Sequence, residues 1–326
     1  MKRGLIAWDR TELPPAAFDS RLACVRKALA ERDLPALAVY TDVWRSNQGR
    51  HFTNFMPYWN RALIVLPREG APVLLCALSP RVYPWIRSVT ILDEIRPAGN
   101  LTQKLFEMCS EKNWAQIGVL DLARLPSDLY VPMQTGAIQA VDVPGHIVWP
   151  SLDEWELSMH RRAAQLARQI LTAELSNANE CLDHELAGRL ERQFRRAGAE
   201  DLVILMTDGR TALRPPNGTR INEHSSVMVA VEYRGHWVKL MRSYPTTSAA
   251  AGLESLFSSS VNDLGARLNT PVYLELLWGP YPYEPCEPAE VSAGSLFALQ
   301  IEVPYDGYRL FYGDTGWQGQ QGASII

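Results

Sequence analysis

The chain has 326 residues, of which 47% are hydrophobic and 21% are charged, and its formal net charge is -4. This length exceeds the size at which one hydrophobic core usually stops growing, so the sequence predicts two domains of a globular protein. Because Lys and Arg are scattered along a slightly acidic chain, the charge argues against nucleic acid and anionic membranes as partners.

The first half of the chain alternates helical and extended patterns. Apolar residues at spacings of three and four predict a helix over 18–32, and 101–113 has a similar pattern. Short apolar runs predict four strands, at 36–40, 62–66, 73–77 and 117–120. Helices that alternate with short buried strands indicate an α/β domain, which we place at residues 1–148.

The pattern changes near Pro150, where a long amphipathic helix is expected. Ser151 is the expected N-cap, with Glu154 three residues later to complete a capping box. A second helix is expected to begin near Asp183 and to end at Gly198, a typical helix-terminating residue. Extended runs follow at 202–206, 227–233 and 296–302. We assign residues 149–326 to a second domain.

Targeting and redox signals are weak. No apolar run reaches the roughly 20 residues that span a bilayer, and residues 1–10 lack the continuous apolar core of a signal peptide. The five cysteines lie far apart and form no Cys-x-x-Cys pair, which argues against a disulfide framework and against a zinc ribbon. We therefore expect a cytoplasmic protein with no membrane partner.

Five segments resemble, in order, motifs of the creatinase, aminopeptidase P and prolidase family. Residues 153–164 look like the helix that opens its catalytic domain, and 184–199 look like its second helix. The others are similar to its N-terminal Tyr-Leu-Thr-Gly-Phe, its Gly-Tyr…Thr-Arg-Thr-Phe hairpin and its Glu-Pro-Gly strand, at 51–55, 233–244 and 297–302. The resemblance implies an α+β homodimer with an N-terminal α/β domain and a C-terminal pita-bread domain, a curved antiparallel sheet flanked by helices.

The metalloenzymes of this family hold two divalent cations with two Asp, one His and two Glu, the hard ligands that such ions require. By the resemblance, Met228 and Lys239 occupy the Asp positions, Trp278 replaces the His, and Gly313 replaces the last Glu. Only Glu302 keeps its carboxylate. We therefore predict no metal, no other cofactor and no metallopeptidase activity.

Creatinase is a metal-free member of the family that uses a His as acid and base. That position falls near Arg214, where this chain has no His. The stretch between Arg242 and Trp278 is also shorter than in family members, which predicts a lost helix and a more open or reshaped pocket. The creatinase mechanism therefore does not carry over intact.

Three residues are candidates for catalysis: Glu302, His236 and Lys239. Glu302 can bind a substrate cation, act as a general base, or form a structural ion pair with Arg242. Lys239 can receive a substrate carboxylate, supply a nucleophilic amine, or only neutralise Glu302. His236 is an acid–base residue or a hydrogen-bonded turn residue. These alternatives stay open at the level of sequence.

A second set of residues is assigned to substrate binding: Arg61, Arg242, Glu232, Trp278, Tyr281 and Tyr283. The aromatic residues lie in a Pro-rich segment, where they either form a box for an apolar or cationic ligand or fill the vacated metal cavity. Arg61 lies where creatinase-like dimers send an Arg into the partner's active site, and the alternative is a surface ion pair. Cys286 has no neighbouring base in the sequence, which favours an inert thiol.

Two functions remain open from the sequence. The first is a metal-independent, creatinase-like enzyme that cleaves a C–N bond, by hydrolysis or elimination, in a small polar amino-acid-like or guanidino-like substrate. The second is a pita-bread pseudoenzyme that serves as a dimeric binding or scaffold protein.

Overall fold

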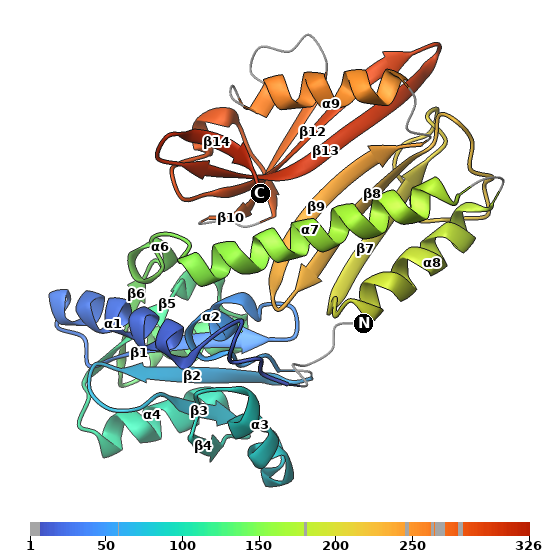
Figure 1. Cartoon of the computed structure of the whole chain (residues 1–326). Helices are drawn as coiled ribbons and strands as arrows, with labels where there is room; N and C mark the ends of the chain where they lie inside the picture. The colour runs from blue at the N-terminus through green and yellow to red at the C-terminus, as the bar shows by residue number, and fades with distance from the viewer. Residues whose placement is uncertain are drawn as a thin grey trace. The chain divides into compact units, whose positions relative to one another are not determined.

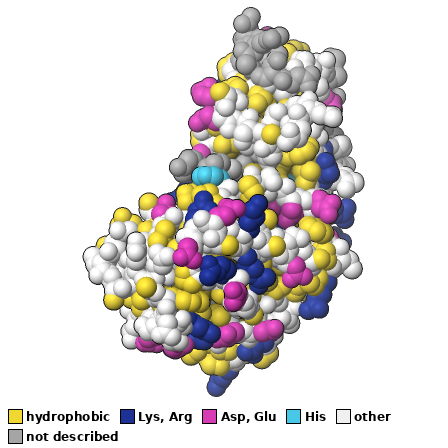
Figure 2. All heavy atoms as spheres, turned by 90° about the vertical axis from the view of Figure 1, so that its left-hand side faces the viewer, with side chains coloured by type: hydrophobic (Ala, Val, Ile, Leu, Met, Phe, Trp, Pro, Cys, Tyr) yellow, Lys and Arg dark blue, Asp and Glu magenta, His cyan; other side chains and the backbone are white. Residues whose placement is uncertain are grey.

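The chain forms two compact units, Met1–Pro150 and Ser151–Ile326 (Figure 1). The computed structural model describes residues 7–57, 59–178, 181–244, 248–261, 264, 271–279 and 283–326. Among these residues, no helix has both the length and the apolar character needed to cross a bilayer. Acidic and basic side chains are interspersed on the face shown in Figure 2, in keeping with the small net charge.

The N-terminal unit contains a six-stranded sheet with the order β4-β3-β2-β1-β5-β6. β2 (Arg61–Pro67) runs antiparallel to both of its neighbours, and the other pairings are parallel. The other strands are β1 (Ala36–Asp42), β3 (Val73–Cys76), β4 (Glu94–Pro97), β5 (Gln116–Leu120) and β6 (Gln139–Val143). The four predicted strands are present, whereas β4 and β6 lie at the sheet edges and lack the apolar run that would have revealed them.

Helices cover both faces of this sheet, because its central strands are apolar on both sides. Leu37 and Val39 of β1 pack with α1 (Pro15–Glu31), whereas Ala36 and Ala38 pack with α4 (Leu101–Glu111) and α5 (Ser127–Thr135). The shorter helical segments are α2 (Asn47–Thr53), η1 (Pro80–Val82), α3 (Tyr83–Val89), η2 (Leu122–Arg124) and α6 (Gly145–Val148).

The C-terminal unit is built on an antiparallel sheet with the order β11-β10-β12-β13-β9-β8-β7, and β14 pairs with β13. Its strands are β7 (Asp201–Thr207), β8 (Ser226–Tyr233), β9 (His236–Ser243), β10 (Val272–Trp278), β11 (Glu284–Pro285), β12 (Leu296–Tyr305), β13 (Tyr308–Gly319) and β14 (Gly322–Ile325). Its helical segments are α7 (Glu154–Ser176), α8 (Asp183–Arg196), α9 (Ser248–Val261) and η3 (Pro288–Glu290). α9 lies in the stretch where the sequence suggested a lost helix.

The long helix α7 begins with a capping box, two residues later than predicted. The Asp153 side chain accepts a hydrogen bond from the Glu156 backbone N–H at 2.8 Å, and the Glu156 carboxylate accepts one from the Asp153 N–H at 3.1 Å. The predicted cap at Ser151 was therefore wrong. A reciprocal pair of carboxylates satisfies two helix N–H groups and lies at the positive end of the helix dipole.

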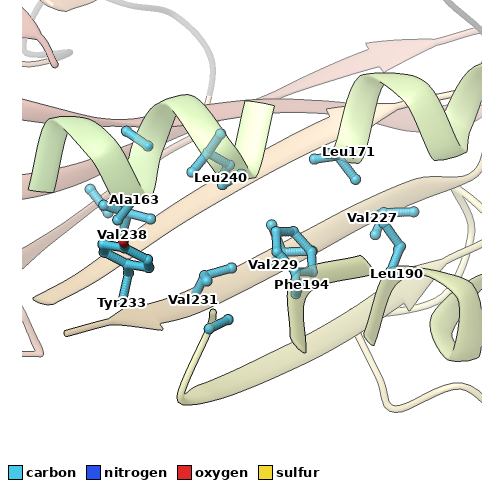
Figure 3. Packing of buried hydrophobic residues seen from close by; sticks show 14 of the residues in the cluster. Ala163, Leu171, Leu190, Phe194, Val227, Val229, Val231, Tyr233, Val238 and Leu240 are labelled. Atoms are coloured by element: carbon cyan, nitrogen blue, oxygen red, sulfur yellow. The ribbon is translucent and has the colours of Figure 1, made fainter. Parts of the chain in front are cut away.

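Helices cover one face of the C-terminal sheet. Val227, Val229 and Val231 of β8 lie in the same buried cluster as Leu171 of α7 and Phe194 of α8 (Figure 3). On the other half of the sheet, alternate residues of β12, from Phe297 to Ile301, pack with α9. Side chains alternate along a strand, so the residues between these positions point away from the helices.

The face away from the helices is called the inner face below. It carries Met228, Ala230 and Glu232 of β8, Trp237, Lys239 and Met241 of β9, Gln300 and Glu302 of β12, Tyr273 and Glu275 of β10, and Phe311, Gly313 and Thr315 of β13. The positions at which the resemblance implies metal-binding carboxylates, including 228, 239 and 313, belong to this face. A functional site is therefore to be sought there.

Candidate functional site

An ion pair between Lys239 and Glu275 occupies the middle of the inner face. Nζ lies 2.5 Å from Oε2, and the two side chains are 22% and 23% exposed. Between their strands lie Thr315 and Ala298: Ala298 pairs with Glu275 and with Thr315, and the Lys239 backbone N–H donates to the Thr315 hydroxyl at 2.8 Å. Lys239 of β9 and Glu275 of β10 thus meet above two small residues, Ala298 and Thr315, which belong to the two strands between β9 and β10. The sheet is concave at this point.

Aromatic residues lie beside the ion pair. The indole of Trp237 meets the ring of Tyr283 edge to face, with centroids 6.3 Å apart. The backbone N–H of Tyr283 donates to the carbonyl of Leu276 at 2.5 Å, which ties Tyr283 to β10. Glu232, opposite Trp237 in the β8–β9 ladder, is fully buried. This end of the inner face thus combines one cation, two carboxylates and two aromatic rings.

Apolar side chains fill the inner face on the β7 side. Met228, Met241 and Phe311 form a buried cluster, and Leu213 from the β7–β8 loop packs against it. Met228 stands at the first Asp position that the resemblance implies, so this position is packed and not open to an ion. In the described part of the chain, no three His, Cys, Asp or Glu side chains gather as a metal site would require.

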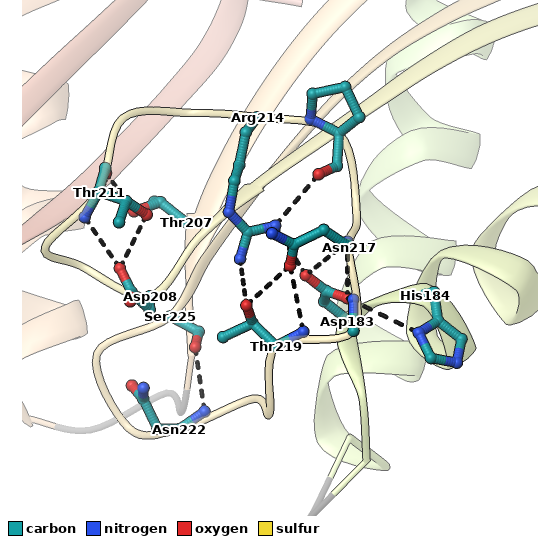
Figure 4. A network of polar contacts seen from close by, with 12 residues as sticks. Asp183, His184, Thr207, Asp208, Thr211, Arg214, Asn217, Thr219, Asn222 and Ser225 are labelled. Carbon is teal, nitrogen blue, oxygen red and sulfur yellow. Dashed lines mark hydrogen bonds and ion pairs between the residues drawn. The ribbon is translucent and has the colours of Figure 1, made fainter.

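The loop that carries Leu213 is anchored at the start of α8 (Figure 4). The Asp183 carboxylate accepts hydrogen bonds from the backbone N–H of Asn217 at 3.1 Å and of Gly218 at 2.7 Å, and it pairs with Arg214 at 2.9 Å. Burial alone would raise the pKa of Asp183, but these donors hold it below its usual range. Arg214, near which creatinase would have its His, therefore has a structural role here.

Glu302 lies at the other end of the inner face. Its carboxylate accepts a hydrogen bond from the Tyr273 hydroxyl at 3.0 Å and lies 3.6 Å from Nη1 of Arg309. These partners replace the predicted ones, Arg242 and Lys239. Ala298 of β12 lies beside Glu275, and Glu302 is four residues further along the same strand. At the rise of a β-strand, Glu302 is therefore about 13 Å from the row of the sheet that holds Glu275.

Gly313 stands where the resemblance implies the last metal-binding carboxylate. Its neighbour on β12 is Gln300, whereas Glu302 lies opposite Phe311. A Cβ atom added to Gly313 would lie 2.6 Å from the Gln300 side chain and 3.0 Å from the Leu299 carbonyl oxygen. A Glu at position 313 would therefore require Gln300 to move. The carboxylate of Glu302 therefore lies two residues along β12 from Gln300, the residue opposite Gly313.

Arg242 lies on the helix face of β9. Its guanidinium donates to Asp314 at 2.7 Å and to the carbonyls of Met241 and Gly313, and it stacks over Tyr312 at 4.0 Å. Arg168 of α7 donates to the same carboxylate at 2.8 and 2.9 Å. Arg242 thus ties α7 to the sheet and does not line the inner face.

His236 also points toward the helices. Its Nδ1 lies 2.9 Å from the Arg234 carbonyl, and its ring meets His160 of α7 edge-on, with centroids 4.9 Å apart. His160 is buried, and its Nδ1 lies 3.1 Å from the carbonyl of Trp237. Burial lowers the pKa of His160 to about 4, even though Glu156 and the Trp237 carbonyl favour its charged form. The three residues proposed for catalysis thus occupy three separate places.

The remaining candidates are distributed over both units. Trp278 is partly buried and packs against the core shared by α7, α8 and β8, and Tyr281 lies outside the described residues. In the N-terminal unit, Arg61 pairs with Asp128 at 2.5 Å, and this contact lowers the pKa of Asp128. Burial and, to a lesser degree, Glu290 raise the pKa of the Cys286 thiol, which disfavours the nucleophilic thiolate.

Glu275, Tyr273 and Trp237 were not predicted as site residues from the sequence. The first two alternate with Val272, Leu274 and Leu276 at a period of two, which is the signal of a half-buried strand. Trp237 follows His236 directly and therefore belongs to the opposite face of β9. Reading the alternation of β9 and β10 would have placed all three on one face.

Comparison of the sequence with protein-family models and with curated proteins gave no match. Solved structures of similar shape include X-Pro aminopeptidase from Thermotoga maritima MSB8, with a TM-score of 0.73, 12% identity, and coverage of 93% of this chain and 96% of that chain. Prolidase from Thermococcus sibiricus has a TM-score of 0.68 at 14% identity, with 94% and 96% covered. The N-terminal domain of FACT complex subunit SPT16 from Eremothecium gossypii has a TM-score of 0.63 at 13% identity, with 98% and 97% covered.

These similarities establish the pita-bread fold for this chain. They confirm the predicted α+β architecture, with an N-terminal α/β unit followed by a curved antiparallel sheet with helices on one side. At 12–14% identity they concern the fold alone.

Proposed function

We propose that the C-terminal unit binds a small zwitterionic molecule on the inner face of its sheet, without a metal ion. The ion pair Lys239–Glu275 carries this proposal, because two opposite charges lie 2.5 Å apart and each side chain remains partly exposed. An amino acid or a guanidino acid carries a cation and a carboxylate a few ångströms apart. Its carboxylate can contact Lys239 while its cation contacts Glu275, which leaves no charge uncompensated.

The surroundings of the pair support a small ligand. Trp237 and Tyr283 offer aromatic surface to the cationic or apolar part of such a molecule. On the β7 side, the cluster of Met228, Met241 and Phe311 fills the face and limits the available space.

The test is calorimetric titration of the full chain with glycine, proline and guanidinoacetate. We expect at least one of them to bind, and we expect Lys239→Met and Glu275→Gln each to weaken binding at least about tenfold, the loss of one charge-assisted contact. Glu254→Gln, an exposed change on α9, is the matched control and should bind as the wild type does. If both site variants bind like the control, the proposal is wrong.

A second candidate is cleavage of a C–N bond in the bound molecule, by hydrolysis or elimination. The observation that favours it is the set of ionisable groups on one face: Lys239 and Glu275 in direct contact, with Glu232 in the next row. For this second candidate function, Lys239 and Glu275 would transfer the protons that cleavage of the C–N bond requires. Glu302, about 13 Å along β12, would serve only a longer substrate.

Catalysis is tested by incubating each molecule that binds with the protein and measuring released ammonia or amine. A catalytic site predicts release that stops in Glu275→Gln, whereas Glu302→Gln should retain it for a short substrate. If no product exceeds the buffer control, cleavage is excluded for these molecules, and the binding proposal stands by itself. The SPT16 domain provides a precedent for this fold in a subunit of a complex.

We further propose a homodimer that forms through a patch on the N-terminal unit. Four exposed residues lie close to the Arg61–Asp128 pair along the chain or across the β1–β2 ladder: Trp44, Trp59, Tyr130 and Val131. Trp44 lies near Trp59 because Asp42 pairs with Arg61 in the β1–β2 ladder. Trp, Tyr and Arg are enriched at the centres of interfaces. A patch that carries both charges is complementary to itself across a two-fold axis.

Light scattering during size-exclusion chromatography tests the dimer. The wild type should elute with twice the chain mass, and Trp44→Ser combined with Trp59→Ser should elute as a monomer. Tyr305→Ser, which removes an exposed aromatic residue from the other unit, should leave the dimer intact. A wild-type monomer at 100 micromolar would contradict the proposal.

A further inference from the structure

A cavity in the N-terminal unit forms a second candidate binding site. It has a volume of about 340 Å³ and lies between the β2–β3 turn and the C-terminal end of α4. Small-molecule pockets range from about 300 to 1,000 Å³, so the cavity has room for a compact ligand. Its apolar walls are formed by Pro35, Pro67, Val73, Met108 and Trp114.

The walls of this cavity are held by contacts within the protein. The turn is fixed from two directions: the Arg68 backbone N–H donates to the Pro35 carbonyl at 2.8 Å, and Arg26 donates to the Gly70 carbonyl at 2.9 Å. Met108 belongs to the buried core below, and Trp114 packs against that core. The aromatic wall is therefore present without a ligand, which reduces the entropic cost of binding.

The rim of the cavity carries charges of both signs. Its charged residues are three cations and two carboxylates: Arg68, Arg96, Lys112, Glu69 and Glu94. Arg96 is neutralised by Glu94 and by Glu111, each at 2.7 Å. Arg68 has a weaker partner, because Asp33 lies 3.3 Å away and its side chain is 94% exposed, where water screens the pair. Arg68 and the exposed Lys112 are thus available to an anion.

We propose that this cavity binds a small aromatic carboxylate. The ring would lie against Trp114 and Met108, and the carboxylate would contact Arg68 and Lys112. An arginine side chain grips a carboxylate through two parallel N–H donors, and offset aromatic rings attract each other beyond their buried area. An uncharged ligand would cover Arg68 without replacing its water.

The experiment is calorimetric titration of the full chain with 2-naphthoate, and with 2-naphthamide as the uncharged analogue. We expect the carboxylate to bind and the amide to bind at least about tenfold more weakly, the contribution of a charge-assisted contact. Arg68→Ala and Lys112→Ala should each weaken naphthoate binding about fivefold or more. The matched control is Lys104→Ala, which removes a partly exposed cation from α4 outside the cavity and should leave naphthoate binding unchanged.

The position of the ligand is tested separately by the indole N–H resonance of Trp114, assigned through Trp114→Phe. This resonance should shift with naphthoate, and the shift should saturate at the calorimetric affinity. Equal affinity for acid and amide, equal affinity of the site variants and the control, or no binding at millimolar naphthoate would each overturn the proposal.

Discussion

Lys239 stands where the resemblance implies an acidic residue, and its charge is balanced by Glu275 from another strand. A partly buried ammonium without a partner would be costly, because its hydration is reduced and nothing replaces it. The carboxylate from β10 removes this cost. The charge of Lys239 is therefore balanced by a residue outside the ligand positions that the resemblance implies.

This dependence predicts strong coupling between the two residues. Lys239→Met and Glu275→Gln should each lower the free energy of unfolding by about 1–3 kcal/mol, because each leaves one charge partly buried and unpaired. The double variant should lose clearly less than the sum of the two. Urea unfolding of the four proteins measures the coupling. Additive losses would show that the pair contributes no stability.

His160 should make stability depend on pH. Its pKa falls from the ordinary 6.5 to about 4 in the folded protein, so the unfolded chain binds a proton in this interval that the folded chain does not. The contribution of His160 is therefore complete above pH 6.5 and is lost as pH falls toward 4. We expect a loss on the order of 2 kcal/mol between pH 7 and pH 4.5.

The comparison for this prediction is His160→Gln, which keeps a donor for the Trp237 carbonyl but does not titrate. Urea unfolding at both pH values should give this variant a smaller loss than the wild type. Parallel pH dependences in the two proteins would rule out His160 as the source.

At the scale of elements, the β7–β8 loop acts as a cover for the inner face. Asp183 anchors it from α8, and Leu213 extends the apolar cluster of Met228, Met241 and Phe311. Asp208 and a β-bridge between Met206 and Arg214 also hold the loop, and Asp183 is the buried carboxylate that anchors residues 214–218. Helix, loop and sheet are thereby joined.

Removing the anchor charge should loosen the loop. Asp183→Asn keeps the size of the side chain but loses the pair with Arg214, and we expect a cost of about 1–3 kcal/mol. Hydrogen exchange should become faster at residues 213–219. Glu223→Gln, an exposed change in the same loop, is the control and should leave exchange unchanged. Unchanged protection in Asp183→Asn would mean that the other contacts suffice.

At the scale of the whole molecule, the fold should persist without metal. The positions that the resemblance assigns to ligands hold a buried Met, a paired Lys, a packed Trp and a Gly crowded by Gln300. A ligand that binds only the folded state raises its stability. We therefore expect the thermal midpoint to stay within about 1 °C when EDTA, Mn²⁺ or Co²⁺ is added. Stoichiometric metal in the purified protein would contradict this.

The sequence by itself determined the order and type of most elements. Apolar residues at helical spacing and cap signals located α1, α4, α7 and α8, and short apolar runs located the central strands, because a strand that is buried on both faces is apolar throughout. The resemblance supplied the pita-bread fold, and reading its ligand positions predicted that the metal site was lost. The edge strands β4 and β6 were not predicted, because half-exposed strands lack a continuous apolar run.

Only the tertiary structure decided which side chains meet. Glu302 and His236 were grouped with Lys239 because they lie near the family's motifs, but strand parity directs His236 to the helices, and register places Glu302 four residues beyond Ala298. The partner of Lys239 is 36 residues away and reaches it across two intervening strands. Strand order, register and curvature determine which side chains come into contact. These three features depend on the packing of the complete sheet, so no local sequence pattern predicts them.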